Sequence, residues 1–473
     1  MTFDHNRRRF LYRSLVGVGG VALMDLLNAD LRAATAGNPL APKKPHHTPK
    51  AKACIFLTML GGVSQMDTFD PKPALEKFDN TVMDWSKEKL TDQVNLFAKP
   101  RLILRSPWKF QKYGQSGRDV SELFPHLAKH VDELALVKSI VTENGNHPAA
   151  TFLMNTGLVL PGRPSVGSWV TYGLGSENNS LPGFVVLPDY RALPFSGSQQ
   201  WGPGFLPASY QGTMMHWKGN PIADLRPATP LSERDQNEQM ELLRSFNHAY
   251  LQNNFTNPEL QGRIDAYELA YRMQTEVPQV LNVAKETEAI RESYGLNDET
   301  TRSFGTRCLM ARQLVEKGVR FVQLYTPSQS WDSHTDILKG HAKNAAETDK
   351  PIAALLTDLK ERGLLDSTLV VWMGEFGRTP DNPAEMRGKP GRDHNTKAMT
   401  MFFAGGGVKP GVSVGETDDL GWKAVKDIYH MRDVHATILH LMGLNDMRLT
   451  YYSAGRNMRL TDTGGEVIKE IVA

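Results

Sequence analysis

The chain has 473 residues, of which 40% are hydrophobic and 22% are charged. This is ordinary globular composition, with room for one large domain that carries an insertion or for two domains, and it excludes a disordered or fibrous chain. The 54 basic and 52 acidic residues leave a net charge of +2, which gives no field that would favour nucleic acid or an anionic membrane surface. We therefore expect no nucleic-acid partner.

The N-terminus predicts an export signal. Three arginines at residues 7–9 precede Phe10, a modest apolar run at residues 15–24 and small residues at 33–36. This order is typical of a twin-arginine signal peptide, which carries folded proteins across a membrane, so residues 1–36 are predicted to be the signal. A membrane anchor is the alternative, but the apolar run is only about half of the roughly 20 residues that a spanning helix needs.

The expected location is the periplasm or the extracellular space, with no stable membrane span after signal removal. Residues 37–52 contain prolines, lysines and histidines and are predicted to be a linker into the mature fold. Cys54 and Cys308 lie in apolar segments, which favours two buried free thiols over a disulfide.

From residue 53 to residue 473 the chain is predicted to be one α/β domain, because apolar strand-like runs alternate with helical patterns. Strands are expected at residues 53–60, 134–137, 319–325, 369–373 and 399–404, and helices at 120–131, within 144–157, and at 301–317, 351–362 and 434–442. This alternation indicates a doubly wound, mostly parallel sheet flanked by helices. Residues of about 193–300 are predicted to be a loop and helical insertion or cap, with helices at 235–251 and 261–275.

Acidic and imidazole side chains follow three of these strands, where parallel sheets bind ligands. The candidate metal ligands are Asp67, Asp332, His334, Glu375, Asp393 and His394. Single carboxylates after strands are often helix caps and single loop histidines are often surface residues, but their occurrence at several strand ends favours metal ligation. We predict a divalent metal cofactor, with zinc, calcium and magnesium as the options.

Three motifs carry a family resemblance, namely residues 66–73, 331–334 and 374–378. Through them, residues 52–461 resemble the exported family known as domain of unknown function 1501, and residues 365–411 resemble the metal-binding end of the alkaline-phosphatase superfamily. The resemblance implies an alkaline-phosphatase-like fold in which Asp332, His334 and His394 bind one metal. A second metal would take Asp67, with Glu375 and Phe376 standing where an Asp-His pair is expected. Phenylalanine cannot bind a metal, so the second site is altered or lost unless another side chain supplies a donor.

The resemblance also bears on the nucleophile. Counted back from Thr156 and Gly157, the nucleophile position holds His147 in place of a hydroxyl or thiol. Thr151 and Thr142 are alternative nucleophiles if the local geometry differs, and His147 is alternatively a replacement for the missing imidazole ligand. The Cys-x-Pro-Ser-Arg motif that yields formylglycine in sulfatases is absent from the sequence, which argues against that mechanism.

Two functions follow as hypotheses. The first is an exported metal-dependent hydrolase of phosphate or sulfate esters that acts on a small-molecule or polysaccharide ester, with His147 catalytic and Arg378 holding an oxyanion. For Arg378, an ordinary surface ion pair is the alternative role. The second is a non-catalytic binding or surface-assembly protein that retains a degenerate metal site.

Overall fold

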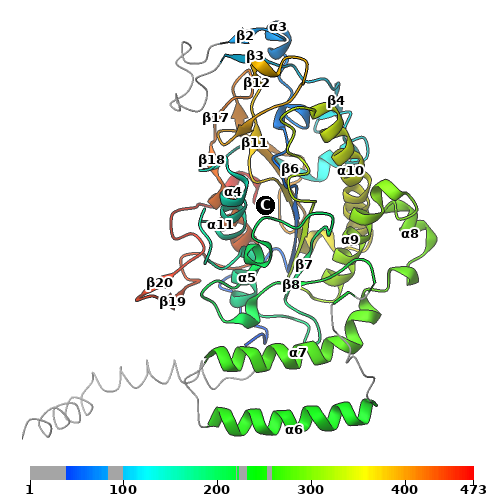
Figure 1. Ribbon diagram of the computed structural model, residues 1–473, viewed down its shortest axis with the longest axis vertical. Helices are drawn as coiled ribbons and strands as arrows, with labels where there is room; N and C mark the ends of the chain where they lie inside the picture. Colours follow the sequence, from blue (N-terminus) through cyan, green and yellow to red (C-terminus); the bar gives the residue numbers. More distant parts are fainter. Residues whose placement is uncertain (1–38, 84–99, 220, 223–231, 253–257) are drawn as a thin grey trace, which may run out of the picture.

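A large central sheet with helices on both faces organises the molecule (Figure 1). The computed structural model describes residues 39–83, 100–219, 221–222, 232–252 and 258–473, so the predicted signal peptide at residues 1–36 lies outside the described residues. Within them, no helix is both long and apolar enough to cross a membrane.

The described part of the chain forms a nine-stranded central sheet in the order β15-β6-β14-β10-β1-β9-β7-β8, with β18 beside β6. The strands are β1 (Ala53–Thr58), β6 (Leu134–Val141), β7 (Phe184–Leu187), β8 (Thr213–Met214), β9 (Phe321–Tyr325), β10 (Thr368–Met373), β14 (Met399–Ala404), β15 (Ser413–Val414) and β18 (Tyr429–His430). Pairing is parallel except that β14 runs antiparallel to both β10 and β6. The predicted α/β class with a mostly parallel sheet is confirmed.

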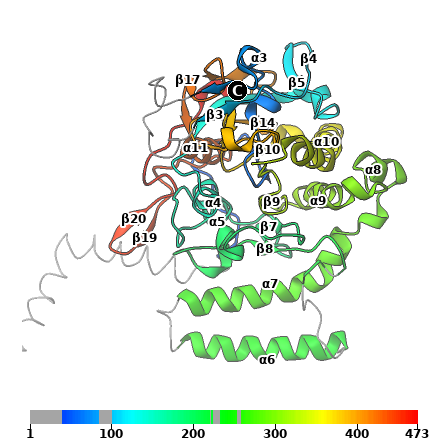
Figure 2. The ribbon, with the colours of Figure 1, turned by 45° about the horizontal axis from the view of Figure 1, so that its top comes forward.

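Helices cover both faces of this sheet, with α9 and α10 on one side and α4, α5 and α11 on the other (Figures 1 and 2). Their bounds are α4 (His147–Thr156), α5 (Val166–Leu174), α9 (Glu299–Glu316), α10 (Ile337–Glu361) and α11 (Met431–Leu441). Strand β1 explains the two layers, because Ile55 and Leu57 pack into the core on one face and Cys54 and Phe56 into the core on the other. Every residue of β1 is buried, as its continuous apolar run predicts.

Further α-helices and small sheets lie outside the central sheet and the helices that cover it. The helices are α3 (Leu75–Phe78), α6 (Glu233–Gln252), α7 (Pro258–Val280) and α8 (Glu288–Ser293). One small sheet has three strands, in the order β12 (Asp381–Pro383), β3 (Arg101–Ile103) and β2 (Val82–Met83). The two-stranded sheets are β11 (Gly377–Arg378) with β13 (His394–Asn395), β4 (Phe110–Tyr113) with β5 (Arg118–Ser121), β16 (Glu416–Thr417) with β17 (Ala424–Lys426), and β19 (Tyr451–Ser453) with β20 (Arg456–Met458). Helices α6 and α7 form a hairpin at the lower end of the molecule in Figure 1. Both cysteines are buried free thiols, as predicted.

One predicted helix was wrong, and another was predicted too short. Residues 120–131 form the end of β5 and a 3-10 helix, Leu127–Glu133, because Pro125 disfavours the helical conformation at Phe124. The helix expected at residues 351–362 begins at Ile337, where the side chain of Asp336 accepts a hydrogen bond from the Lys339 N–H group. Pro351 therefore lies inside α10 and does not begin it.

Residues 39–52, the predicted linker, lie along the folded domain. The Lys43 N–H group donates to the Leu174 carbonyl at 2.8 Å, and the Ala51 N–H group donates to the Leu441 carbonyl at 2.8 Å. The Lys43 ammonium donates to the Tyr172 carbonyl at 2.7 Å and lies over the Tyr172 and Tyr210 rings. Burial lowers the pKa of Lys43 to about 8.

Candidate metal centre

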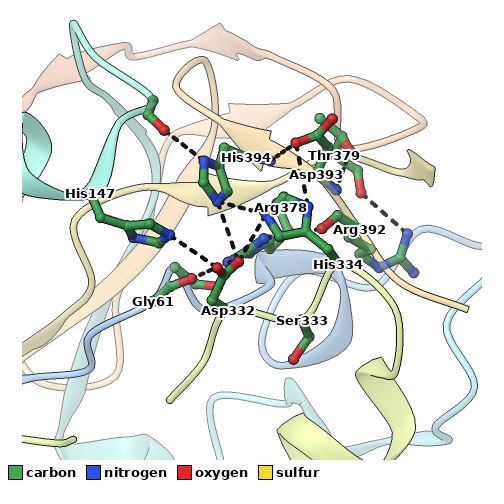
Figure 3. A network of polar contacts seen from close by, with 12 residues as sticks. Gly61, His147, Asp332, Ser333, His334, Arg378, Thr379, Arg392, Asp393 and His394 are labelled. Carbon is green, nitrogen blue, oxygen red and sulfur yellow. Dashed lines mark hydrogen bonds and ion pairs between the residues drawn. The ribbon is translucent and has the colours of Figure 1, made fainter. Parts of the chain in front are cut away.

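Three neighbouring parallel strands, β1, β9 and β10, end at the same edge of the sheet, and the loops that follow β9 and β10 carry Asp332, His334 and Glu375 to that edge. His394 arrives on β13 and His147 on the first turn of α4. Figure 3 shows the imidazoles of His147, His334 and His394 turned toward Asp332.

Asp332 is the centre of this cluster. Its Oδ1 lies 3.0 Å from Nε2 of His334 and 3.3 Å from Nε2 of His394, and its Oδ2 lies 3.3 Å from Nε2 of His147. Burial opposes ionisation of Asp332, but the three neighbouring imidazoles and the charge of Arg378 hold its pKa well below its usual range. Asp332 is therefore an anion at every physiological pH.

Two overlapping groups in the described part of the chain bring potential ligand atoms within 4.8 Å of one another: His147, Asp332 and His394, and His334, Asp393 and His394. Nε2 of His334 and Nε2 of His394 are 3.0 Å apart. Two atoms that bind one ion at roughly 2.1 Å with tetrahedral geometry lie about 3.4 Å apart, so these spacings suit ligands of a common metal. The donor set fits a divalent ion.

Hydrogen bonds on the far side of the rings fix two of these imidazoles. His394 Nδ1 lies 2.6 Å from the Gly145 carbonyl, and His147 Nδ1 lies 2.7 Å from Oε1 of Glu375. A carbonyl or carboxylate in this position accepts a hydrogen bond from Nδ1–H, so the lone pair of the neutral ring lies on Nε2. This is the usual support of a metal-binding histidine. Burial alone would lower the pKa of His147, but the carboxylates of Asp332 and Glu375 outweigh it and raise the pKa to about 9.

Glu375 supports the cluster and lies outside both ligand groups among the described residues. Besides holding His147, its two carboxylate oxygens accept the Gly61 N–H group at 2.9 and 3.1 Å. Asp67 is also engaged elsewhere, because Arg392 donates to its Oδ2 at 2.6 Å and Ser64 donates to the same oxygen at 2.5 Å. Asp67 belongs to neither ligand group of the described residues, and the Arg392 guanidinium supplies the positive charge that balances its carboxylate.

Arg378 points into the protein. It is fully buried and donates to Oδ1 of Asp332 at 2.7 Å, to the Gly62 and Arg392 carbonyls at 2.9 and 3.0 Å, and to the Gly61 carbonyl. These bonds use most of its N–H donors, which contradicts the expected role of holding a substrate oxyanion. Arg378 instead ties the loop after β1 to Asp332.

The alternative hydroxyl nucleophile is also turned inward. Thr151 is buried on α4, and its hydroxyl donates to the His147 carbonyl one turn earlier at 2.6 Å. A cavity of ≈ 770 Å³ opens beside His147 and His394. It is lined by residues 143–148, Phe195, Gln329, Thr379, residues 393–397 and Trp422. This volume is within the range of small-molecule sites.

Sequence reasoning gave no role to three residues of the site. Arg392 pairs with Asp67, Arg101 donates to Oδ2 of Asp393 at 3.2 Å, and Gly145 holds His394. The position of Arg392 directly before Asp393 and His394 was a usable signal, since an arginine among carboxylates is a common ion-pair partner. Arg101 and Gly145 reach the site only through the tertiary fold.

These features define an α/β protein with a candidate metal centre at the carboxyl edge of its sheet. Residues 51–472 match the family described as protein of unknown function (DUF1501), and the chain belongs to that family. None of the curated proteins compared with the chain matches it.

Solved structures to which the chain shows some similarity include three enzymes. They are the lipoteichoic acid synthase LtaP from Listeria monocytogenes (TM-score 0.36, 9% identity, 89% of this chain and 78% of the other), alkaline phosphatase from the Antarctic bacterium TAB5 (TM-score 0.35, 10% identity, 84% and 99%) and the PsFucS1 sulfatase from Pseudoalteromonas sp. (TM-score 0.31, 13% identity, 89% and 70%). Similarities of this size do not bear on the reaction of this chain.

Proposed function

We propose that this protein is an exported metal-dependent hydrolase of phosphate or sulfate esters. The observation that carries the proposal is the convergence of Asp332, His334, Asp393 and His394 beside a ≈ 770 Å³ cavity that Asp393 and His394 line. Burying carboxylates and imidazoles together is unfavourable unless a cation or a network of hydrogen bonds compensates their charge. A bound divalent ion would polarise the ester oxygens and stabilise the charge that develops on them.

The chemistry of the donors favours zinc among the three candidate metals. Three imidazoles surround Asp332, and imidazole nitrogen suits zinc, whereas calcium and magnesium prefer oxygen ligands. The chain's own residues prepare this site, since Gly145 sets the tautomer of His394 and Arg378 holds Asp332 ionised. The substrate proposed is a small-molecule or polysaccharide ester whose organic part occupies the cavity.

The test uses the mature chain without residues 1–36, purified with no added chelator and reloaded with zinc, magnesium or calcium. We expect zinc to bind near one equivalent or more per chain by elemental analysis and to support release of 4-nitrophenol from aryl phosphate or aryl sulfate. His394→Ala should lose both, whereas His126→Gln, at an exposed histidine, should lose neither. Zinc-loaded protein that hydrolyses neither ester class would contradict the proposed reaction.

One observation favours the second function, a non-catalytic binding or surface-assembly protein. The hydroxyl of Thr151 is hydrogen-bonded within its own helix, so α4 presents no hydroxyl nucleophile to the cluster. On this alternative, metal content would be normal, hydrolysis would be absent, and a polysaccharide ester would bind without being cleaved. Equilibrium binding of an uncleaved polysaccharide ester to the metal-loaded protein separates the two functions.

A further inference from the structure

One buried nitrogen in the site has no hydrogen bond. His147 is 6% exposed, and its Nε2 lies 3.3 Å from Oδ2 of Asp332 but is not aligned for a hydrogen bond with it. Leaving a buried polar atom unsatisfied is unfavourable, and in native proteins such atoms commonly belong to functional groups. Figure 3 shows this nitrogen directed at Asp332, and His147 also lines the cavity.

The rest of the ring is held rigidly. Glu375 is 1% exposed and is fixed by the Gly61 N–H group. Its Oε1 lies 2.7 Å from Nδ1 of His147 and accepts the hydrogen bond from Nδ1–H. Phe376 and His394 pack against the imidazole with ring centroids 4.9 and 4.5 Å away. A carboxylate that orients an imidazole, with the opposite nitrogen left free of a hydrogen bond, is a recurrent arrangement for activating a catalytic side chain.

The position of His147 on its helix suits an anionic reactant. It is the first residue of the ten-residue helix α4, which follows Asn146 as the N-cap. The N-terminus of a helix carries unpaired N–H groups and a partial positive charge, so an anion approaching His147 is stabilised there. Asn146 and Pro148 line the cavity beside it.

We propose that His147 is the nucleophile of a phosphoryl transfer and that Glu375 is its positioning residue. This inference rests on the proposed function and names its substrate class, a phosphate monoester. In the neutral form of the ring, the lone pair of Nε2 forms a bond to phosphorus while the ester O–P bond breaks, and the electron pair leaves on the alcohol oxygen, which takes a proton from water. A second water molecule then attacks phosphorus, the N–P bond breaks, its proton returns to solvent, and inorganic phosphate leaves with the imidazole restored.

In this role His147 is not required to hold the metal, because His334, Asp393 and His394 form a ligand group without it. Replacing the nucleophile and replacing a ligand therefore have different consequences. His147→Ala should keep bound zinc, whereas His394→Ala should lose it. Zinc content measured on both variants is a readout that does not depend on turnover.

The decisive experiment traps the covalent intermediate. Zinc-loaded protein is mixed with a ³²P-labelled aryl phosphate and quenched in alkali, which preserves phosphohistidine. We expect label on residue 147 by peptide mass spectrometry, its loss after acid treatment, and a reduction in turnover of about 100-fold or more in His147→Ala and His147→Asn. Added imidazole should restore part of the turnover of His147→Ala, which a merely structural defect would not allow.

Glu375→Gln tests the positioning residue. The amide keeps the size of the side chain but cannot balance the positive charge that develops on the imidazole, so kcat and the rate of label formation should fall by about 10-fold with KM and zinc content unchanged. Thr151→Ala, on the same helix, is the matched control and should retain both the label and the turnover. Label on Thr151 or Thr142 would overturn the assignment of the nucleophile.

Two further outcomes are decisive. Turnover without label on His147, or loss of zinc in His147→Ala, would overturn the inference and make His147 a ligand while leaving the proposed hydrolase intact. If no ester is hydrolysed, the proposed function fails, and phosphoramidate then serves as a phosphoryl donor that requires no esterase activity. Selective phosphorylation of His147 over the exposed His126 would still support the inference, and its absence would overturn it.

Discussion

His341 is a buried imidazole directly behind the loop that carries Asp332 and His334. Its Nε2 accepts the Ser64 N–H group at 3.1 Å, and its Nδ1 lies 3.2 Å from the Ser333 hydroxyl. Burial lowers the pKa of His341 to about 3, helped by the charges of Arg378 and Arg392 and opposed by Asp67. The folded protein therefore needs this ring neutral.

This burial predicts a pH-dependent free energy of unfolding. In the unfolded chain the ring takes up a proton below about pH 6.5, whereas the folded chain takes it up only near pH 3. The contribution of His341 is therefore present above about pH 6.5 and is lost toward pH 3, at about 1.4 kcal/mol per pH unit at most. Urea midpoints of metal-free protein between pH 7 and pH 4 should fall more steeply in the wild type than in His341→Gln.

The matched control for this titration is His126→Gln, because His126 is exposed. Its midpoints should follow those of the wild type at every pH. If His341→Gln gave the same pH slope as the wild type, a neutral buried ring at this position would be ruled out.

Asp332 and His334 give the most direct prediction on the metal. Removing either side chain takes away one donor and leaves the neighbouring imidazole without its partner 3.0 Å away. Asp332→Ala and His334→Ala should each lower zinc affinity by about 10-fold or more, with an unchanged circular dichroism spectrum. Competition with a fluorescent zinc chelator measures this, and unchanged affinity in both variants would remove the support for the site.

At the scale of elements, the turn after β1 sets the position of the Asp332 loop. Gly61 has φ +118°, and a Cβ there would lie 2.5 Å from the Asp332 nitrogen and 2.6 Å from the Trp331 nitrogen. Both neighbours are backbone atoms, so neither can move aside without displacing the loop. Gly61→Ala should lower the free energy of unfolding by about 3 kcal/mol and weaken zinc binding.

Gly162 provides the control for this clash. Its φ is also positive, +96°, but a Cβ at this position meets nothing within 4 Å. Gly162→Ala should therefore show only the cost of the backbone conformation, about 1 kcal/mol, with zinc affinity unchanged. Equal losses in the two variants, measured by chemical denaturation, would show that close approach to Asp332 has no role.

The strands and helices show which parts of the fold can be predicted from the sequence. Strands such as β1 and β10 were predictable because they are buried on both faces and therefore continuously apolar. The segment at residues 120–131 has buried apolar residues at helical spacing, yet its backbone is governed by Pro125 and by pairing with β4. The spacing of apolar residues indicates which side chains are buried. In this segment a strand end and a 3-10 helix bury the same side chains that an α-helix would.

The site divides in the same way. Asp332 and His334 were predictable as a pair because residues just after parallel strands meet at one edge of a sheet, whereas His394 reaches them from β13. Sequence could not predict which carboxylates are ligands and which only support the site. Glu375 is reached by His147 and Asp67 by Arg392, and these pairings arise only in the folded chain. Partners that are distant in sequence decide these roles.

At the scale of the whole molecule, α6 stands apart from the site. Leu242, Phe246 and Tyr250 recur every four residues on it and are 55–62% exposed, whereas Val277 on α7 is fully buried in the core. Phe246→Ser should change the free energy of unfolding by no more than about 0.5 kcal/mol and leave zinc binding unchanged. Val277→Ala should lower it by about 2 kcal/mol in the same denaturation assay, and a larger effect at Phe246 than at Val277 would contradict this arrangement.

The central place of β1 has a consequence for the order of events during synthesis. Ala53–Thr58 leaves the ribosome long before its two neighbours in the sheet, β9 and β10, which begin at Phe321 and Thr368. Even the adjoining segment waits longer, because Ala51 bonds to Leu441. For most of translation this wholly apolar strand has unpaired edges, the state in which such segments associate with one another. The nascent chain must therefore be shielded until its C-terminal third has been made, and folding is completed only after translation.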